Sequence, residues 1–163
     1  MNDSIFVDSN IFLYAFTQID DDSKDEEIRK QEIASNIILG NISISTQVIN
    51  EVSNNFIRKL GFSNSDVKEF VESCYSRYNI INFSQELFVI ASELRAKYNL
   101  SYYDSMIVSA GLKSGATILY SEDMHNGLMV ENQLQIVNPF KAKEQPTPQQ
   151  LIPPQPTKQT QQE

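Results

Sequence analysis

Four carboxylates in this 163-residue chain are placed where they could act together in catalysis. Asp8 and Asp123 each follow a short apolar run that is typical of a buried strand. Glu51 lies in the first turns of a predicted helix that follows a strand, and Asp104 lies in the first turn of another predicted helix. Open α/β sheets bind ligands outside the carboxyl ends of their strands, so we expect Asp8, Glu51 and Asp123 to meet at that edge.

The chemistry of such a group follows from its charge. Converging carboxylates that have no neighbouring cation repel one another, so they either take up protons or bind cations. Sites made of oxygen ligands favour hard ions such as Mg²⁺ or Mn²⁺. One or two of these ions could activate a water for in-line attack at phosphorus without a protein nucleophile. The four acids therefore predict Mg²⁺- or Mn²⁺-dependent hydrolysis of a phosphoester.

Each acid also has an ordinary structural interpretation. Asp8 could cap the helix that follows it, Glu51 could face solvent, and Asp123 could be a turn residue. Ser101 and Asp104 have the spacing of a capping box, in which Asp104 bonds back to the backbone of Ser101. Asp104 does not follow from the strand-edge rule, although two consecutive helices before the fourth strand allow its helix to reach the same edge.

Other chemistries of acids, thiols and phosphates lack the residues that they need. An aspartyl-phosphate phosphatase generally requires a second acid two residues after the first, and that position is Asn10. Neither a P-loop nor a dinucleotide-binding motif occurs among the five glycines. Cys74 and His125 are the single cysteine and the single histidine of the chain, which excludes an intramolecular disulfide and a Cys/His zinc site. We assign no role to His125.

Strands that alternate with one or two helices must position these acids. Apolar runs predict strands near residues 5–7, 42–44, 80–83, 116–120 and 134–137, and residues 121–127 form a polar turn. Helical periodicity fills the segments between them, most clearly after Ser63 or Asn64, where an apolar stripe includes Cys74 as a small buried hydrophobe. This order predicts an α/β fold with a mostly parallel sheet that is covered on both faces.

Composition limits where the protein acts and what it binds. The net charge of −8 argues against a basic nucleic-acid surface, although residues 20–32 account for half of it and bound metal ions would cancel more. No run of about 18 apolar residues is present, so we expect no membrane span and a cytoplasmic protein. We expect one domain over residues 1–140, followed by a disordered Pro/Gln-rich tail over residues 141–163.

Four short motifs, in this order and spacing, resemble those of the PIN domain family, especially the VapC-type toxin ribonucleases. They are Val7-Asp8-Ser9-Asn10, Thr46-Gln47-Val48-Ile49-Asn50-Glu51, Leu100-Ser101-Tyr102-Tyr103-Asp104-Ser105-Met106-Ile107 and Leu119-Tyr120-Ser121-Glu122-Asp123-Met124. The resemblance covers about residues 3–140. It implies a three-layer α/β/α sandwich with a mostly parallel central sheet, and a Mg²⁺- or Mn²⁺-dependent endoribonuclease that cuts RNA.

The resemblance also implies roles for individual residues and partners. The family's catalytic, metal-binding acids match Asp8, Glu51, Asp104 and Asp123, and the small polar residues that support them match Asn10 and Ser121. A protein antitoxin and a homodimer are the partners that it implies.

Two alternatives remain open from the sequence. The fold could be a binding module whose acids are idle, or the enzyme could be a structure-specific DNA nuclease. The basic residues Arg58, Lys59 and Lys113 could guide RNA, but a solvated helix face explains them equally well.

Overall fold

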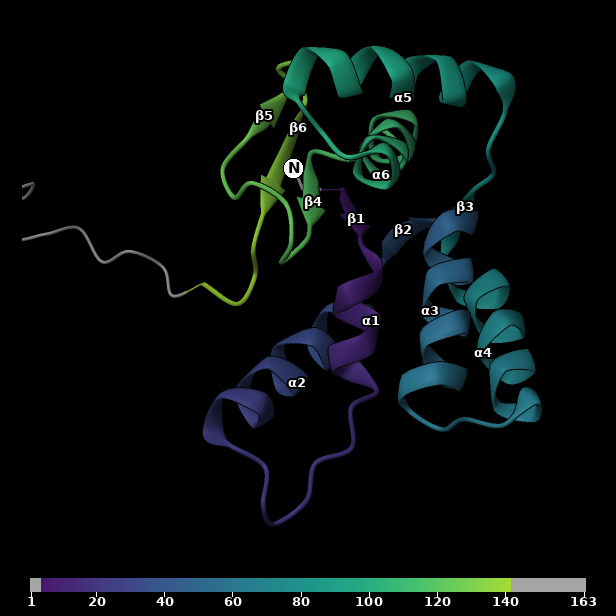
Figure 1. Ribbon diagram of the computed structural model, residues 1–163, viewed down its shortest axis with the longest axis vertical. Coiled ribbons are helices and arrows are strands. Elements are labelled where there is room, and N and C mark those ends of the chain that lie inside the picture. Colours follow the sequence, from purple (N-terminus) through teal and green to yellow (C-terminus); the bar gives the residue numbers. More distant parts are fainter. Residues whose placement is uncertain (1–3, 142–163) are drawn as a thin grey trace, which may run out of the picture.

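The computed structural model describes residues 4–141, which form a central sheet with helices on both faces (Figure 1). In chain order the elements are β1 (Ile5–Val7), α1 (Ser9–Ala15), α2 (Asp25–Ile38), β2 (Ile42–Ser45), α3 (Thr46–Lys59), α4 (Asn64–Arg77), β3 (Asn79–Ile81), α5 (Gln85–Tyr98), α6 (Tyr102–Lys113), β4 (Ile118–Tyr120), β5 (Met129–Val130) and β6 (Leu134–Val137). The expected disordered tail over residues 141–163 lies outside the described residues, except for residue 141.

The sheet has the strand order β3-β2-β1-β4-β6-β5, and all of its pairings are parallel except that of β5 with β6. This confirms the predicted mostly parallel sheet. Strand β5 was not predicted, because two residues are too few to show a period of two. It forms a short antiparallel hairpin with β6 at the edge of the sheet.

The helices form three pairs around the sheet, which gives the three-layer α/β/α sandwich. Helices α5 and α6 stack on one face, whereas the pairs α1–α2 and α3–α4 extend together on the other side (Figure 1). Helix α6 is buried along residues 105–111 because it lies between α5 and the sheet. Gly111 permits this close approach, since a Cβ atom there would lie 2.9 Å from Cδ2 of Leu134.

Local sequence signals account for the helix ends. Of the two expected caps, Ser63 begins α4: its hydroxyl accepts a hydrogen bond from the backbone of Asp66 in a capping box. The α4 stripe buries Phe70 and Cys74, which confirms Cys74 as a core residue. Helix α3 begins after Ser45, whose hydroxyl accepts a hydrogen bond from the backbone N–H of Val48 at 3.3 Å.

Candidate active site

Asp8 lies at the carboxyl end of the central strand β1 and is only 6% exposed. One of its carboxylate oxygens accepts a hydrogen bond from the backbone N–H of Ser9 at 2.7 Å. The other accepts one from the hydroxyl of Ser121 at 2.8 Å and a longer one from the amide of Asn10 at 3.4 Å. Asp8 is thus the N-cap of α1, as its ordinary interpretation predicted, and its second oxygen also joins a buried polar cluster.

Burial is the main reason that the pKa of Asp8 rises from 3.8 to about 6. The hydrogen bonds from Ser121 and Ser9 oppose this rise, because they stabilise the ionised form. The negative charges of Glu51 and Asp104 increase it. Within residues 4–141, no lysine, arginine or histidine forms an ion pair with Asp8. The site therefore concentrates negative charge without a cation to balance it.

Glu51 is brought to Asp8 by the residue that follows Asp8 in the chain. The hydroxyl of Ser9 donates a hydrogen bond of 2.7 Å to one carboxylate oxygen of Glu51, and the amide of Gln47 donates one of 2.8 Å to the other. Both contacts were absent from our predictions. The i,i+4 spacing of Gln47 and Glu51 on α3 is a signal that could have indicated the second contact.

Asp104 reaches the same edge because α6 runs back across the sheet. Helix α6 ends shortly before β4 begins, so its first turn lies near the carboxyl end of the strands. Ser101 caps the helix by accepting a hydrogen bond from the backbone of Asp104 at 3.1 Å. The expected reciprocal bond of a capping box does not form, and the Asp104 carboxylate has no hydrogen bond within the described part of the chain. The carboxylate is therefore left free to face a ligand.

Asp123 is the exposed member of the group and is connected to Asp8 through Asn10. The amide nitrogen of Asn10 lies 3.2 Å from a carboxylate oxygen of Asp123 and also contacts Asp8 and Ser121. The amide oxygen of Asn10 accepts a hydrogen bond from the backbone of Glu122 at 3.4 Å. Asn10 thus connects helix α1 to the loop after β4, which carries Asp123.

A second contact holds the same loop. Lys30 of α2 and the hydroxyl of Tyr14 both donate hydrogen bonds to the carboxylate of Glu122, next to Asp123. The side chains of Lys30 and Glu122 are about one-fifth exposed. Lys30 and Glu122 are 92 positions apart in the chain, so no local pattern in the sequence indicates this pairing.

An open cleft of about 390 Å³ lies beside the acids. Asp104 and Asp123 both line it, together with His125, to which we had assigned no role. The chain segment before α6 forms the rest of one wall, from Tyr98 to Ser101. This volume falls in the usual range of small-ligand sites.

The oxygen ligands and the uncompensated charge suit a hard divalent cation, and Asp8, Glu51, Asp104 and Asp123 are the residues that would hold it. Within residues 4–141, no three His, Cys, Asp or Glu side chains are close enough to form a metal site as they stand. The amide of Asn10 lies between Asp8 and Asp123, and each of its contacts there is longer than 3 Å. The chemistry of the ligands fits a metal ion, but these side chains must move closer to one another to bind it.

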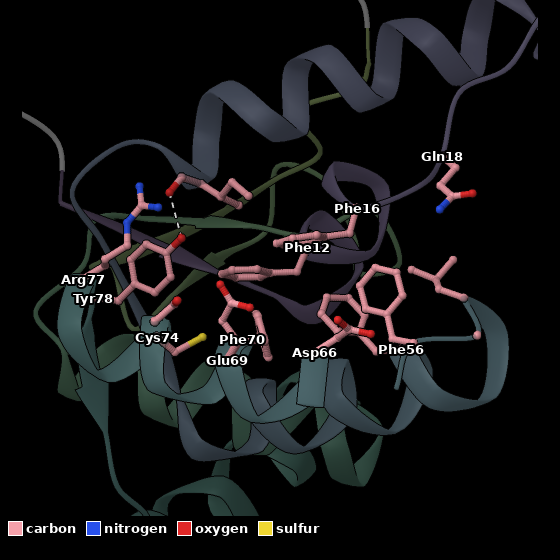
Figure 2. Close-up of a pocket in the computed structure, with 15 residues that line it drawn as sticks. Phe12, Phe16, Gln18, Phe56, Asp66, Glu69, Phe70, Cys74, Arg77 and Tyr78 are labelled. Atoms are coloured by element: carbon pink, nitrogen blue, oxygen red, sulfur yellow. Dashed lines mark hydrogen bonds between the residues drawn. The ribbon is translucent and has the colours of Figure 1, made fainter. Parts of the chain in front are cut away.

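A different cavity, of about 580 Å³, lies among α1, α3 and α4 (Figure 2). Six of its fifteen lining residues are aromatic, and Figure 2 shows Phe12, Phe16 and Phe56 around it, with Asp66 and Glu69 at its side. None of the four acids lines it. This cavity is therefore distinct from the acidic site.

The predicted guiding cations are also distant from the acids. Arg58 and Lys59 are exposed in the last turn of α3, whereas Glu51 lies nearer its start. Lys113 is in the last turn of α6, and it pairs with Glu86.

Among the described residues, no helix is long and apolar enough to cross a membrane.

Comparison with known proteins places this geometry in context. The chain has 18% identity to a protein in a toxin–antitoxin complex from Klebsiella pneumoniae, with a TM-score of 0.61 over 85% of this chain and all of the other. It has 17% identity to VapC20 of Mycobacterium tuberculosis, described as a sarcin–ricin loop cleaving toxin, with a TM-score of 0.58 over 74% of this chain and 90% of VapC20.

A third structure, VapBC2 from Rickettsia felis bound to a promoter DNA fragment, has 19% identity and a TM-score of 0.52 over 82% of this chain and 98% of the other. A search among curated proteins finds no match. At these identities the likeness of the structures establishes the fold alone. The sequence model of the PIN domain matches residues 5–125, which include all four acids. The chain is therefore a member of the PIN domain family.

Proposed function

We propose that this protein is a metal-dependent endoribonuclease that hydrolyses phosphodiester bonds of RNA and acts as the toxin of a toxin–antitoxin pair. The observation that carries the proposal is Asp8, which is buried at the strand edge, faces the charges of Glu51 and Asp104, and has no cationic partner within the described residues. Burying a carboxylate in this way is costly unless a ligand compensates its charge. The folds of the VapC20 toxin and of the toxin–antitoxin complexes support the proposal.

In this proposal Asp8, Glu51, Asp104 and Asp123 hold Mg²⁺ or Mn²⁺. When bound, the ion would stabilise charge on the phosphate and lower the pKa of an attacking water. The polar neighbours orient the acids: Ser121 and Asn10 hold Asp8, and Ser9 and Gln47 hold the two oxygens of Glu51. Removing such a supporting hydrogen bond usually lowers metal affinity or activity by about 10- to 100-fold.

The direct test is cleavage of single-stranded RNA by the purified protein. We expect cleavage with Mg²⁺ or Mn²⁺ and none with a chelator. Asp8→Asn and Asp104→Asn should each lower kcat by at least about a hundredfold, since a ligand should contribute more than a residue that supports it. Glu69→Gln, an exposed acid on α4, is the matched control and should retain activity. Full activity in both aspartate variants would refute the assignment of the site.

Two further measurements separate this proposal from its alternatives. A binding module with idle acids predicts no metal effect, whereas a ligand of the native state must raise the melting temperature. We therefore expect Mn²⁺ to stabilise the wild-type protein and to stabilise Asp8→Asn less. Side-by-side cleavage of RNA and flapped DNA tests the structure-specific DNA nuclease.

The proposed partners can be tested independently of catalysis. We propose a homodimer in the cytoplasm and a protein antitoxin encoded next to this chain. A small adjacent reading frame with an N-terminal DNA-binding motif would support the pairing, and its product should form a complex with this protein and inhibit cleavage. Light scattering of the purified protein would give its oligomeric state.

A further inference from the structure

Two adjacent tyrosines stand out on the surface at the start of α6. Tyr102 is 52% exposed and Tyr103 is 60% exposed, although both are large and mostly apolar. Their rings meet edge to face, with centroids 5.3 Å apart and an angle of 80° between the planes. Asp104 is the next residue in the chain, so the ring pair lies within one helical turn of a proposed catalytic acid.

The fold does not use these side chains as it uses three other tyrosines. The hydroxyls of Tyr14, Tyr78 and Tyr98 all take part in hydrogen bonds that connect separate elements. The hydroxyls of Tyr102 and Tyr103 make none within residues 4–141. Neither burial nor hydrogen bonding therefore explains why two aromatic rings occupy this turn.

The position of the pair relative to the cleft suggests a ligand. Ser101 and Asp104, which flank the two tyrosines in the chain, both line the cleft of about 390 Å³ beside the acids. The two rings do not line the cleft themselves. Because Tyr103 directly precedes Asp104 in the chain, an RNA strand that leaves the cleft over the start of α6 would pass the exposed rings. We propose that Tyr102 and Tyr103 form a stacking surface for an unpaired base of the RNA next to the bond that is cut. This inference rests on the proposed ribonuclease function.

Charge makes stacking the more suitable contact at this place. Proteins usually hold RNA through lysine and arginine, but none of the four acids is paired with either residue in the described part of the chain, and the whole chain has a net charge of −8. Aromatic stacking needs no positive charge and accepts any base, because every base has a π face. Bases in a duplex are already stacked on each other, so such a surface selects single-stranded segments and loops.

The test compares kcat and KM for a fluorescent single-stranded RNA among four proteins. Stacking of one base is worth a factor of about 5 to 150 by alanine substitution, so the double variant Y102A/Y103A should lose about that factor in kcat/KM, mainly through a higher KM. The double variant Y102F/Y103F keeps the rings and should match the wild type. Tyr75→Ala is the matched control, since Tyr75 is 56% exposed on α4. It should also match the wild type.

A set of RNAs in which one base at a time is removed tests stacking directly. At one position next to the cut, base removal should lower kcat/KM for the wild type but have little further effect on Y102A/Y103A. Equal sensitivity of both proteins at every position would overturn the inference. So would a loss in Y102F/Y103F as large as in Y102A/Y103A, because that result would indicate hydroxyl contacts.

The outcomes also separate this inference from the function on which it rests. If the wild type cleaves RNA and Y102A/Y103A cleaves it equally well, the stacking surface is wrong and the ribonuclease proposal stands. If the wild type neither cleaves nor binds RNA, both fail. If Y102A/Y103A changes the oligomeric state measured by light scattering, the tyrosines form a protein interface and the inference is overturned.

Discussion

Asp8 should make the metal-free protein less stable as the pH rises from mildly acidic to mildly alkaline values. Burial raises the pKa of its carboxyl group in the folded protein to about 6, above the ordinary value of 3.8 that applies to the unfolded chain. The folded protein therefore binds this proton more tightly than the unfolded chain does. The stabilising contribution is complete below pH 3.8 and is lost as the pH rises through 6.

The magnitude follows from the two pKa values. At about 1.36 kcal/mol per pKa unit, the rise from 3.8 to about 6 corresponds to a loss of ~3 kcal/mol in the free energy of unfolding once Asp8 is fully ionised. Between pH 5 and pH 8 the expected loss is ~1.4 kcal/mol, because the group is already partly titrated in the unfolded chain at pH 5. Lower pH values are best avoided, since the isoelectric point is about 4.6.

Asp8→Asn removes the titration of Asp8, so the difference in stability between the two proteins reports this contribution. The asparagine places an N–H₂ group near the amide of Asn10 and the hydroxyl of Ser121, which should cost about 1 kcal/mol at any pH. The assay is urea unfolding in the presence of chelator at pH 5, 6, 7 and 8. We expect the stability of Asp8→Asn relative to the wild type to rise by ~1.4 kcal/mol from pH 5 to pH 8.

A difference between the two proteins that stays constant over this range would refute the reasoning, because it would mean that Asp8 keeps its ordinary pKa in the folded state. Repeating the series with saturating Mn²⁺ adds a second check. A cation at Asp8 favours the ionised form, so the pH dependence of the difference should become smaller or reverse in sign.

Two other predictions concern residues outside the acidic group. Lys30→Met should lower the free energy of unfolding by about 1–3 kcal/mol, because it leaves Glu122, whose side chain is only about one-fifth exposed, without its cation. Lys68→Met should change the free energy of unfolding by less than about 0.5 kcal/mol, since the Lys68–Glu72 pair is exposed. Equal effects of the two substitutions in urea unfolding would contradict this. Burial raises the pKa of the Cys74 thiol to about 12, so a disulfide reagent at pH 8 should label Cys74 in urea but not in the native protein. Rapid labelling of the native protein would contradict this prediction, because it would show that the apolar stripe of α4, which includes Cys74, is accessible to solvent.

The sequence alone predicted those features that neighbouring residues encode. The apolar run before Asp8, the stripe around Cys74 and the cap at Ser63 are all visible within one or two helical turns or one short strand. The order of these elements was sufficient to predict the mostly parallel sheet, because short alternating strands and helices have few right-handed arrangements. The edge position of Asp8 followed from the same rule.

Only the tertiary structure decided which side chains meet at that edge. Ser9 reaches Glu51 across 42 positions, and Lys30 reaches Glu122 across 92. Such contacts depend on the register of strands and on helix packing, and a hydroxyl in the sequence looks the same whether it bonds water or a buried carboxylate.

Asp104 illustrates the same limit most clearly. Its spacing from Ser101 predicts a capping box, yet the structure forms only the half made by the Ser101 hydroxyl. The same local sequence allows the carboxylate to bond its own helix end or to face a cleft, so local propensity cannot choose between the two. The packing of α6 against the sheet determines the outcome, because it places Asp104 at the edge where Asp8 lies.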